Sequence, residues 1–119
     1  MTAVTGERFK LGRLVITSGA LTECESYDID YFDLVIRHAT GDFGSVGRLD
    51  DAELTEEILE LGALATSDGL LLNALTITKR QGVIMSVYPI PDLRESKLWI
   101  QTILAGSETY TTILLPSEY

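Results

Sequence analysis

Residues 83–116 read "VIMSVYPIPDLRESKLWIQTILAGSETYTTILLP", and this stretch decides the fold class. It contains three runs that are rich in β-branched and aromatic residues, as strands are: residues 83–90, 97–105 and 110–116. The segments "PDLRES" and "GSET" between the runs are short and made of turn-forming residues. Because short connections join antiparallel neighbours, the stretch predicts a three-stranded antiparallel meander.

A fourth strand is expected near the start of the chain, where residues 12–17 read "GRLVIT". The 119 residues suffice for one domain over 1–119, with residues 1–10 as a short frayed arm. We predict an α+β fold. Its small antiparallel sheet is made of the first strand and the C-terminal three-stranded meander, and it packs against three to four helices.

Two helices are expected before residue 42. Ser18 can cap a short helical turn over residues 20–25. Asp28 can cap a longer helix over residues 29–39, which Gly41 would end in a left-handed conformation. The apolar residues that recur at helical spacing in this second helix, and that we expect to face the core, are Ile29, Phe32 and Ile36.

The segment "LDDAELTEEILELGALA", residues 49–65, predicts an acidic helix that begins at Asp50 with a capping box closed by Glu53. Its apolar stripe consists of Leu54, Ile58 and Leu61. Its opposite side is an acidic stripe without lysine partners, made of Glu53, Glu56, Glu57 and Glu60. Side chains of like charge at this spacing repel one another.

A further helix is expected over residues 70–80, capped by Ser67 or Asp68 and stopped by Gly82. It is apolar almost all round, so it is either a core helix or an interface. In the second case the Leu70–Ile77 helix would join two copies of the chain in a homodimer.

The net charge is −9, and residues 23–60 carry twelve acidic side chains against two basic ones. Such a segment repels phosphate groups and anionic lipids, which argues against binding of nucleic acid or of a membrane surface. It would be steered instead toward a protein partner with a basic surface. We expect the partner-binding residues to be Glu53, Glu56, Glu57, Glu60, Asp30, Asp33, Tyr27 and Tyr31. The alternative for the acidic stripe is a merely solvated helix face.

The segment "RHATGDFG", residues 37–44, has two interpretations. In an enzyme, His38 would be a general acid or base oriented by Asp42, Arg37 would hold an anionic substrate, and Thr111 or Thr112 would assist. In the other interpretation, His38 is a positive imidazole in the last turn of a helix, and Asp42 and the glycines build the turn. We expect no catalytic residue and keep the small enzyme as the alternative.

No metal or cofactor site is expected. One cysteine and one histidine cannot form a structural zinc site, and "DIDYFD" lacks the glycine and the closing glutamate of a calcium loop. Because Cys24 is alone and the N-terminus lacks a signal-peptide pattern, we expect a cytoplasmic protein. The longest apolar run, residues 69–77, is too short to span a bilayer.

Four segments, "LGRLVITSGAL", "RHATGDFG", "KLWI" and "TTILLPSEY", together resemble a family of small uncharacterised bacterial proteins found on phages, plasmids and other mobile elements. The chain departs from the family pattern at Ser18, where the family has proline, and at Phe43, where it has tryptophan. Residues 101–112 are two residues longer than the family's counterpart and lack its acidic and arginine pair. The resemblance implies an accessory protein of a mobile element. Combined with the acidity, it suggests an inhibitor of a host defence complex, of the anti-CRISPR or anti-restriction kind, that mimics nucleic acid.

Overall fold

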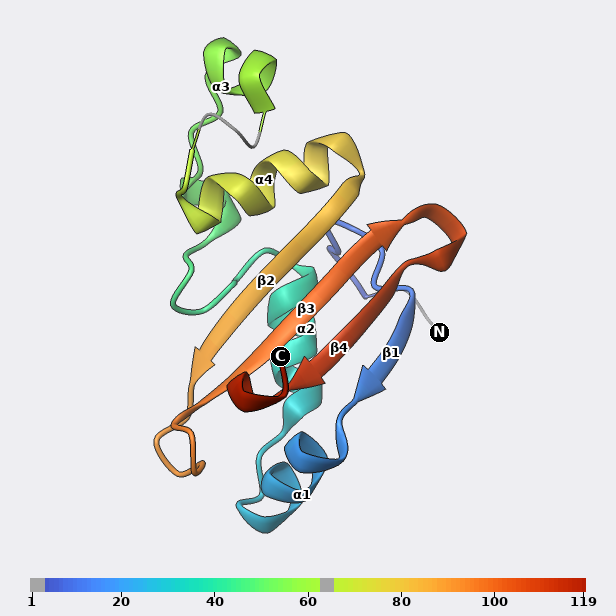
Figure 1. Ribbon diagram of the computed structural model, residues 1–119, viewed down its shortest axis with the longest axis vertical. Helices are drawn as coiled ribbons and strands as arrows, with labels where there is room; N and C mark the ends of the chain where they lie inside the picture. Colours follow the sequence, from blue (N-terminus) through green and yellow to red (C-terminus); the bar gives the residue numbers. More distant parts are fainter. Residues whose placement is uncertain (1–3, 63–65) are drawn as a thin grey trace.

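The computed structural model describes residues 4–62 and 66–119. Its sheet has the strand order β1-β4-β3-β2. The strands are β1 (Arg13–Ile16), β2 (Gln81–Pro89), β3 (Lys97–Ala105) and β4 (Tyr110–Leu114). The α-helices in the described ranges are α1 (Ser18–Ser26), α2 (Tyr31–Ala39), α3 (Glu56–Leu61) and α4 (Gly69–Lys79). Figure 1 shows the meander as three long neighbouring arrows, with β1 beside β4.

The predicted α+β fold, with a first strand, a C-terminal meander and helices packed on the sheet, is confirmed. One detail of the sheet differs. β1 runs parallel to β4, with Leu14 opposite Thr111, so the sheet is mixed and not wholly antiparallel. A parallel neighbour needs a long crossover, and here everything from α1 to β3 lies between β1 and β4 in sequence.

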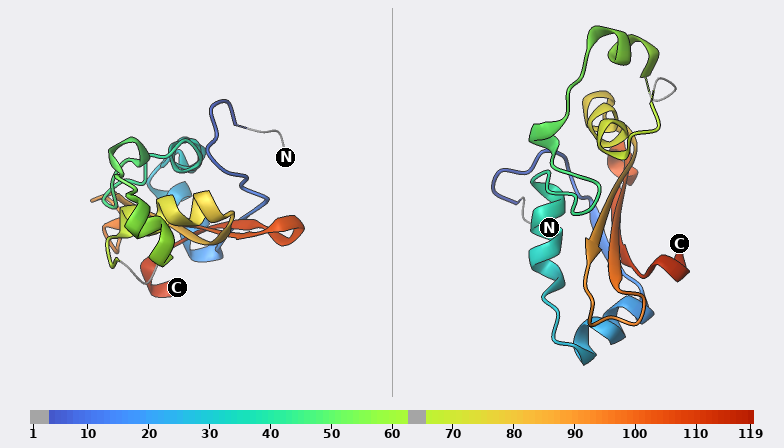
Figure 2. Two further views of the ribbon diagram at one scale, coloured as in Figure 1. Left: turned by 90° about the horizontal axis from the view of Figure 1, so that it is seen from above. Right: turned by 90° about the vertical axis from the view of Figure 1, so that its left-hand side faces the viewer.

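The core lies on one face of the sheet, which α2 and the N-terminal segment cover (Figure 2). In β3 every second side chain is buried, at Leu98, Ile100, Thr102 and Leu104. The segment expected to be a frayed arm is packed in its described part: Phe9 is 8% exposed, and the Arg8 amide donates to the carbonyl oxygen of Ala39. Residues 1–3 lie outside the described residues.

The helix α2 begins two residues later than expected, with Asp30 rather than Asp28 as its N-cap. The predicted apolar face was wrong at Phe32 and Ile36, which are 56% and 47% exposed, whereas Ile29 packs against the core as expected. The buried side chains are instead Leu34, Val35, His38 and Ala39. The polar His38 therefore points into the core, whereas the large apolar side chains of Phe32 and Ile36 point outward.

The expected acidic helix over residues 49–65 is broken. A 3-10 turn, η1 (Leu49–Asp51), is followed by extended backbone at Ala52, and α3 starts after Thr55, whose hydroxyl caps Ile58. The capping box predicted for Asp50 and Glu53 is therefore wrong. Repulsion among the unpaired carboxylates disfavours one continuous helix. Residues 63–65 of the predicted helix lie outside the described residues.

The helix α4 matches its prediction, with Asp68 as the N-cap, and it packs along the edge strand β2. Its buried Asn73 side chain donates to the carbonyl oxygen of Met85 and accepts from the amide of Met85, at 2.9 and 3.0 Å. This amide group thus occupies part of the open edge of the sheet. The helix ends at Arg80 in a left-handed conformation, before the expected stop at Gly82.

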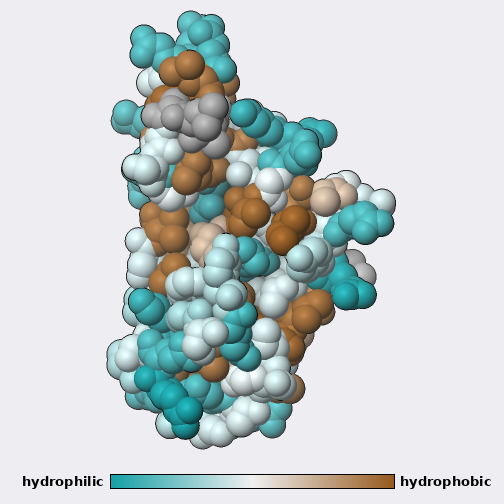
Figure 3. Space-filling view, viewed as in Figure 1, coloured by the Kyte–Doolittle hydropathy of each residue, from teal (hydrophilic) through white to brown (hydrophobic). Residues whose placement is uncertain are grey.

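Within the described ranges, the short 3-10 helix η4 (Pro116–Glu118) contacts β3, and no α-helix lies across the second face of the sheet. This face is turned toward the viewer in Figure 1, and Figure 3 shows apolar surface across its middle. Trp99 is half-buried on this face, with the ring of Tyr119 at a centroid distance of 5.4 Å. The indole Nε1 of Trp99 is shielded from solvent and has no hydrogen-bond partner in the described residues.

Candidate functional site

The acidic arm, which we define as residues 52–62, extends beyond α4 at one end of the molecule (Figures 1 and 2). All four predicted carboxylates of the arm are exposed: Glu53, Glu56, Glu57 and Glu60. None of them forms an ion pair with a lysine or arginine in the part of the chain that the structure describes. Leu59 and Leu61, at 41% and 65% exposed, stand beside them. The arm therefore presents unpaired negative charge together with apolar surface.

A pocket of about 350 Å³ lies between the acidic arm and the start of α4. We call it the acidic pocket. Its apolar lining comes from Ile58, Leu70 and Leu71, and its charged lining from Asp51, Glu53 and Asp68. A lysine or arginine side chain has the matching chemistry, because its aliphatic stem covers apolar surface while its charged end reaches carboxylates.

The other predicted partner-binding residues lie elsewhere. Tyr27, Asp30, Tyr31 and Asp33 belong to the junction of α1 and α2, at the opposite end of the longest axis of the molecule, which measures 46 Å. Asp30 and Asp33 are exposed, and the Asp30 carboxylate caps α2 by accepting from the Asp33 amide. The eight predicted residues therefore form two separate acidic surfaces and not one.

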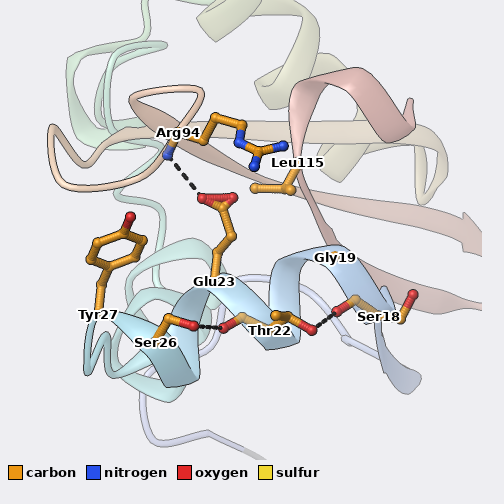
Figure 4. A pocket seen from close by; sticks show the side chains of 8 residues that line it. All are labelled: Ser18, Gly19, Thr22, Glu23, Ser26, Tyr27, Arg94 and Leu115. Carbon is orange, nitrogen blue, oxygen red and sulfur yellow. Dashed lines mark hydrogen bonds between the residues drawn. The ribbon is translucent and has the colours of Figure 1, made fainter.

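Tyr27 also borders a pocket of about 450 Å³ beside α1 (Figure 4). The Glu23 carboxylate accepts from the backbone amide of Arg94, and the Arg94 guanidinium extends over the pocket toward Leu115. The hydroxyl groups of Thr22 and Ser26 are used inside the helix, where each donates to a carbonyl oxygen four residues earlier. Neither hydroxyl is paired with a base that could activate it as a nucleophile.

Arg37 and Asp42 form an ion pair at the surface, with Arg37 Nε 2.9 Å from Asp42 Oδ2. Arg48 Nη2 approaches the same oxygen at 3.7 Å, and the Gly44 amide donates to Asp42 Oδ1. Burial raises the pKa of the Asp42 carboxyl, but the hydrogen bonds from Arg37 and Gly44 and the two arginine charges outweigh it, so the pKa is lowered overall. Asp42 therefore closes the turn and binds arginines; it does not orient His38.

His38 lies in the core with 0% exposure, between hydroxyl groups of two strands. Its Nδ1 is 2.5 Å from Ser86 Oγ, and its Nε2 is 2.8 Å from Thr102 Oγ1. Thr102 Oγ1 is in turn 2.7 Å from Thr111 Oγ1, which donates to the carbonyl oxygen of Leu11. We call this chain of groups the histidine network.

The directions of these bonds follow from counting protons. The Thr111 proton goes to Leu11, so Thr111 Oγ1 accepts the Thr102 proton, and Thr102 Oγ1 accepts from Nε2–H of His38. Nδ1 is then the acceptor for Ser86. Every polar group in the network is satisfied when the imidazole is neutral. Burial lowers the pKa of His38 to about 3, in agreement with this assignment.

The structure thus separates the three residues of the alternative enzyme. Arg37 and Asp42 meet at the surface, whereas His38 is sealed in the core and is neutral, contrary to the helix-dipole interpretation of a positive imidazole. Thr111 reaches His38 through Thr102, and Thr112 points to the other face of the sheet. Sequence reasoning did not predict Ser86 and Thr102 as partners of His38. Both belong to the alternate side chains of their strands that are buried.

The segments "LGRLVITSGAL", residues 11–21, and "TTILLPSEY", residues 111–119, also contact each other. Thr17 donates its hydroxyl proton to Glu118 Oε1 over 2.6 Å, and the Ser117 amide donates to Glu95. Burial raises the pKa of Glu118, but hydrogen bonds from Thr17 and from backbone amides of Leu115, Gly19 and Ala20 lower it overall. The carboxylate of Glu118 thus occupies the N-terminus of α1, where the helix dipole favours an anion.

No group of three or more histidine, cysteine, aspartate or glutamate side chains in the described ranges is arranged to hold a metal ion. Within the same ranges, no helix has both the length and the apolar content that a bilayer span requires. Comparison with protein-family models, with curated proteins and with solved structures found no match for this chain. The class that the fold defines is a small α+β protein with a mixed four-stranded sheet.

Proposed function

We propose that the protein is a non-enzymatic accessory protein that binds a basic surface of a protein partner through the acidic arm. The observation that carries the proposal is the acidic pocket, whose lining combines three acidic residues with three large apolar ones. The exposed carboxylates Glu56, Glu57 and Glu60 of the arm extend the same charge outward. Leu59 and Leu61 supply apolar area that a partner would bury.

The binding mechanism is charge steering followed by anchoring. The net charge of −9 draws a basic surface toward the protein over about 10 Å at ordinary ionic strength. One lysine or arginine of the partner then enters the acidic pocket. The second acidic surface, around Tyr27, Asp30, Tyr31 and Asp33, is an additional contact for a partner long enough to reach the other end of the molecule.

The finer proposal concerns the partner. A channel that binds a nucleic-acid backbone presents lysines and arginines at phosphate spacing, and carboxylates on a protruding arm can occupy such a channel. We therefore propose a host defence complex that handles nucleic acid as the target, in agreement with the resemblance to proteins of mobile elements. The protein would then be an inhibitor of the anti-CRISPR or anti-restriction kind, acting in the cytoplasm.

The small enzyme based on Arg37, His38 and Asp42 is less well supported. A general acid or base must reach the proton that it transfers, and the ring of His38 is 0% exposed. Its two nitrogens are already engaged by Ser86 and Thr102.

Affinity capture from a lysate of the native bacterial host tests the proposal. The arm variant carries Glu53→Gln, Glu56→Gln, Glu57→Gln and Glu60→Gln. The control variant carries Asp92→Asn and Glu108→Gln, two exposed acids outside both acidic surfaces, and its match in charge is an arm variant with only Glu56→Gln and Glu57→Gln. Captured proteins are identified by mass spectrometry at low and at high salt.

We expect the wild type and the control variant to capture the same nucleic-acid-handling complex, and high salt to release it. The arm variant should lose it, and His38→Ala should matter only through stability. Capture that is equal for the arm variant and the wild type would show that the arm is a solvated surface without a partner.

A further inference from the structure

A second pocket, of opposite charge, lies between the N-terminal segment, the end of α4 and the β3–β4 hairpin. Its volume is about 400 Å³. We call it the basic pocket, and its lining consists of Arg8, Phe9, Lys10, Ile77, Arg80, Leu104, Gly106 and Thr109. Three of the nine lysines and arginines of the chain therefore gather around one cavity, and no acidic residue lines it.

The floor of the basic pocket is apolar and rigid. Phe9 and Leu104 are 8% and 7% exposed and belong to the core, and Ile77 packs against the same cluster. The ring of Phe9 stands edge-on to the imidazole of His38 at a centroid distance of 5.2 Å. Phe9 thus contacts both the basic pocket and the histidine network.

The three cations are not equally available. Arg8 Nη1 is 3.1 Å from Asp50, an exposed pair that contributes little stability. Lys10 Nζ is 3.0 Å from Glu7, whose side chain is 16% exposed, while the Lys10 side chain is 81% exposed. Arg80 forms no ion pair with any residue in 4–62 or 66–119. Its backbone has φ +59°, a left-handed conformation that is unfavourable for a residue with a side chain. The chain thus places an arginine at a position that suits glycine or asparagine better, at the edge of this pocket.

We propose that the basic pocket binds a small amphipathic organic anion, namely a carboxylate with an apolar tail. The tail lies on Phe9, Ile77 and Leu104, and the carboxylate meets Arg80 and Lys10 at the rim. The volume falls within the range of about 300–1,000 Å³ that is usual for small-molecule sites.

This inference does not rest on the proposed function. The two pockets have different linings, so either one can fail its test alone.

The test titrates the ¹⁵N-labelled full chain with octanoate and follows amide shifts by NMR. Octanol, which has the same tail without the charge, and inorganic phosphate, which has charge without a tail, are the two comparison probes. We expect octanoate to bind at least tenfold more tightly than either probe, with shifts concentrated at residues of the basic pocket. Equal binding of octanoate and octanol, or amide shifts concentrated on the second face of the sheet, around Trp99, would overturn the proposal.

The variant Arg80→Asn removes the charge and keeps the left-handed backbone, which asparagine tolerates. The matched control Lys97→Gln removes one charge from the far end of β3, outside the pocket. We expect Arg80→Asn to weaken octanoate binding about tenfold while its thermal midpoint stays equal or rises, and Lys97→Gln to leave the affinity unchanged. Unchanged affinity in Arg80→Asn, or equal losses in both variants, would contradict the site.

Discussion

His38 is a buried polar residue that connects one helix to two strands through hydrogen bonds. It joins α2 to the edge strand β2 and to the central strand β3, because Ser86 comes from β2 and Thr102 from β3. Burying an imidazole costs little free energy of folding when both of its nitrogens are hydrogen-bonded. Removal of one partner leaves a buried polar atom unsatisfied and lowers the stability of the fold. The histidine network therefore fixes which face of α2 meets the sheet.

The protonation of His38 predicts a pH dependence of stability. The pKa is about 3 in the folded protein and about 6.5 in an unfolded chain, so between these values only the unfolded state binds the proton. The free energy of unfolding should therefore fall as the pH falls, by about 2 kcal/mol from pH 7 to pH 5. Denaturant unfolding at both pH values measures this loss.

The control is His38→Gln, in which this part of the pH dependence should be absent. In the wild type, the imidazole carbon protons should show no titration by NMR down to pH 5. An imidazole that titrates near pH 6.5 in the folded protein would contradict its assignment as a buried neutral ring.

The hydroxyl groups of the network can be tested with a neighbouring pair. Thr111→Val leaves the Thr102 hydroxyl without its acceptor and the Leu11 carbonyl without its donor, and it should lower the free energy of unfolding by about 1–3 kcal/mol. Thr112→Val is the matched control, because Thr112 is half-buried on the other face and its hydroxyl makes no hydrogen bond within the described ranges. Equal losses in the two variants, measured by chemical denaturation, would show that the network adds nothing specific.

At the scale of elements, periodicity predicted the strands, the existence of the helices and most of the bounds. It failed where buried polar residues decide the outcome. In α2 the apolar spacing of Ile29, Phe32 and Ile36 suggested one face, but the face that meets the sheet contains His38, whose hydrogen-bond partners are far away in sequence. Pairing over 48 and 64 residues leaves no local signal.

The prediction of one acidic helix over residues 49–65 failed for a different reason. The segment's pattern of leucines and glutamates fits a long helix, yet helix propensity is weak compared with the repulsion of unpaired carboxylates and the loss of packing at the tip of the molecule. Of the candidate site, the sequence could predict the charge, the exposure and the missing cations of the arm. It could not predict either pocket, since each is lined by residues from distant segments.

Substitution of two glycines, Gly12 and Gly106, tests how closely the start of β1 approaches the β3–β4 hairpin. Gly12 precedes β1 with φ +64°, and a side chain there would overlap the carbonyl oxygen of Thr109. Gly12→Ala should therefore cost about 2–5 kcal/mol of stability. Gly106→Ala, with φ +58° and open space around it, should cost only about 1–2 kcal/mol. Thermal or chemical unfolding of the two variants compares them directly, and a reversed order would contradict the close packing of β1 against the end of the hairpin.

At the scale of the whole molecule, the fold distributes charge unevenly. The acidic arm and the acidic pocket lie at one end of the long axis, the acidic α1–α2 junction lies at the other, and the basic pocket carries a third of the lysines and arginines. Between them the face of the sheet opposite the core carries apolar patches among more polar surface (Figure 3). The two proposals therefore concern separate places on the molecule: the acidic arm for a basic protein and the basic pocket for an organic anion. Self-association through the Leu70–Ile77 helix stays a prediction, although Ala74 and Leu75 are already buried within the monomer.

The central claim is that the acidic arm is the partner-binding surface, and site-specific crosslinking tests it most directly. A photoreactive residue replaces Leu61, which is 65% exposed on the arm, and in a second protein it replaces the exposed Ser107 of the β3–β4 hairpin. After irradiation in the native host, mass spectrometry identifies the crosslinked peptides. The account predicts crosslinks from position 61 to a lysine- and arginine-rich surface of one partner protein, and none to that protein from position 107. Crosslinks from both positions alike, or none from position 61, would contradict it.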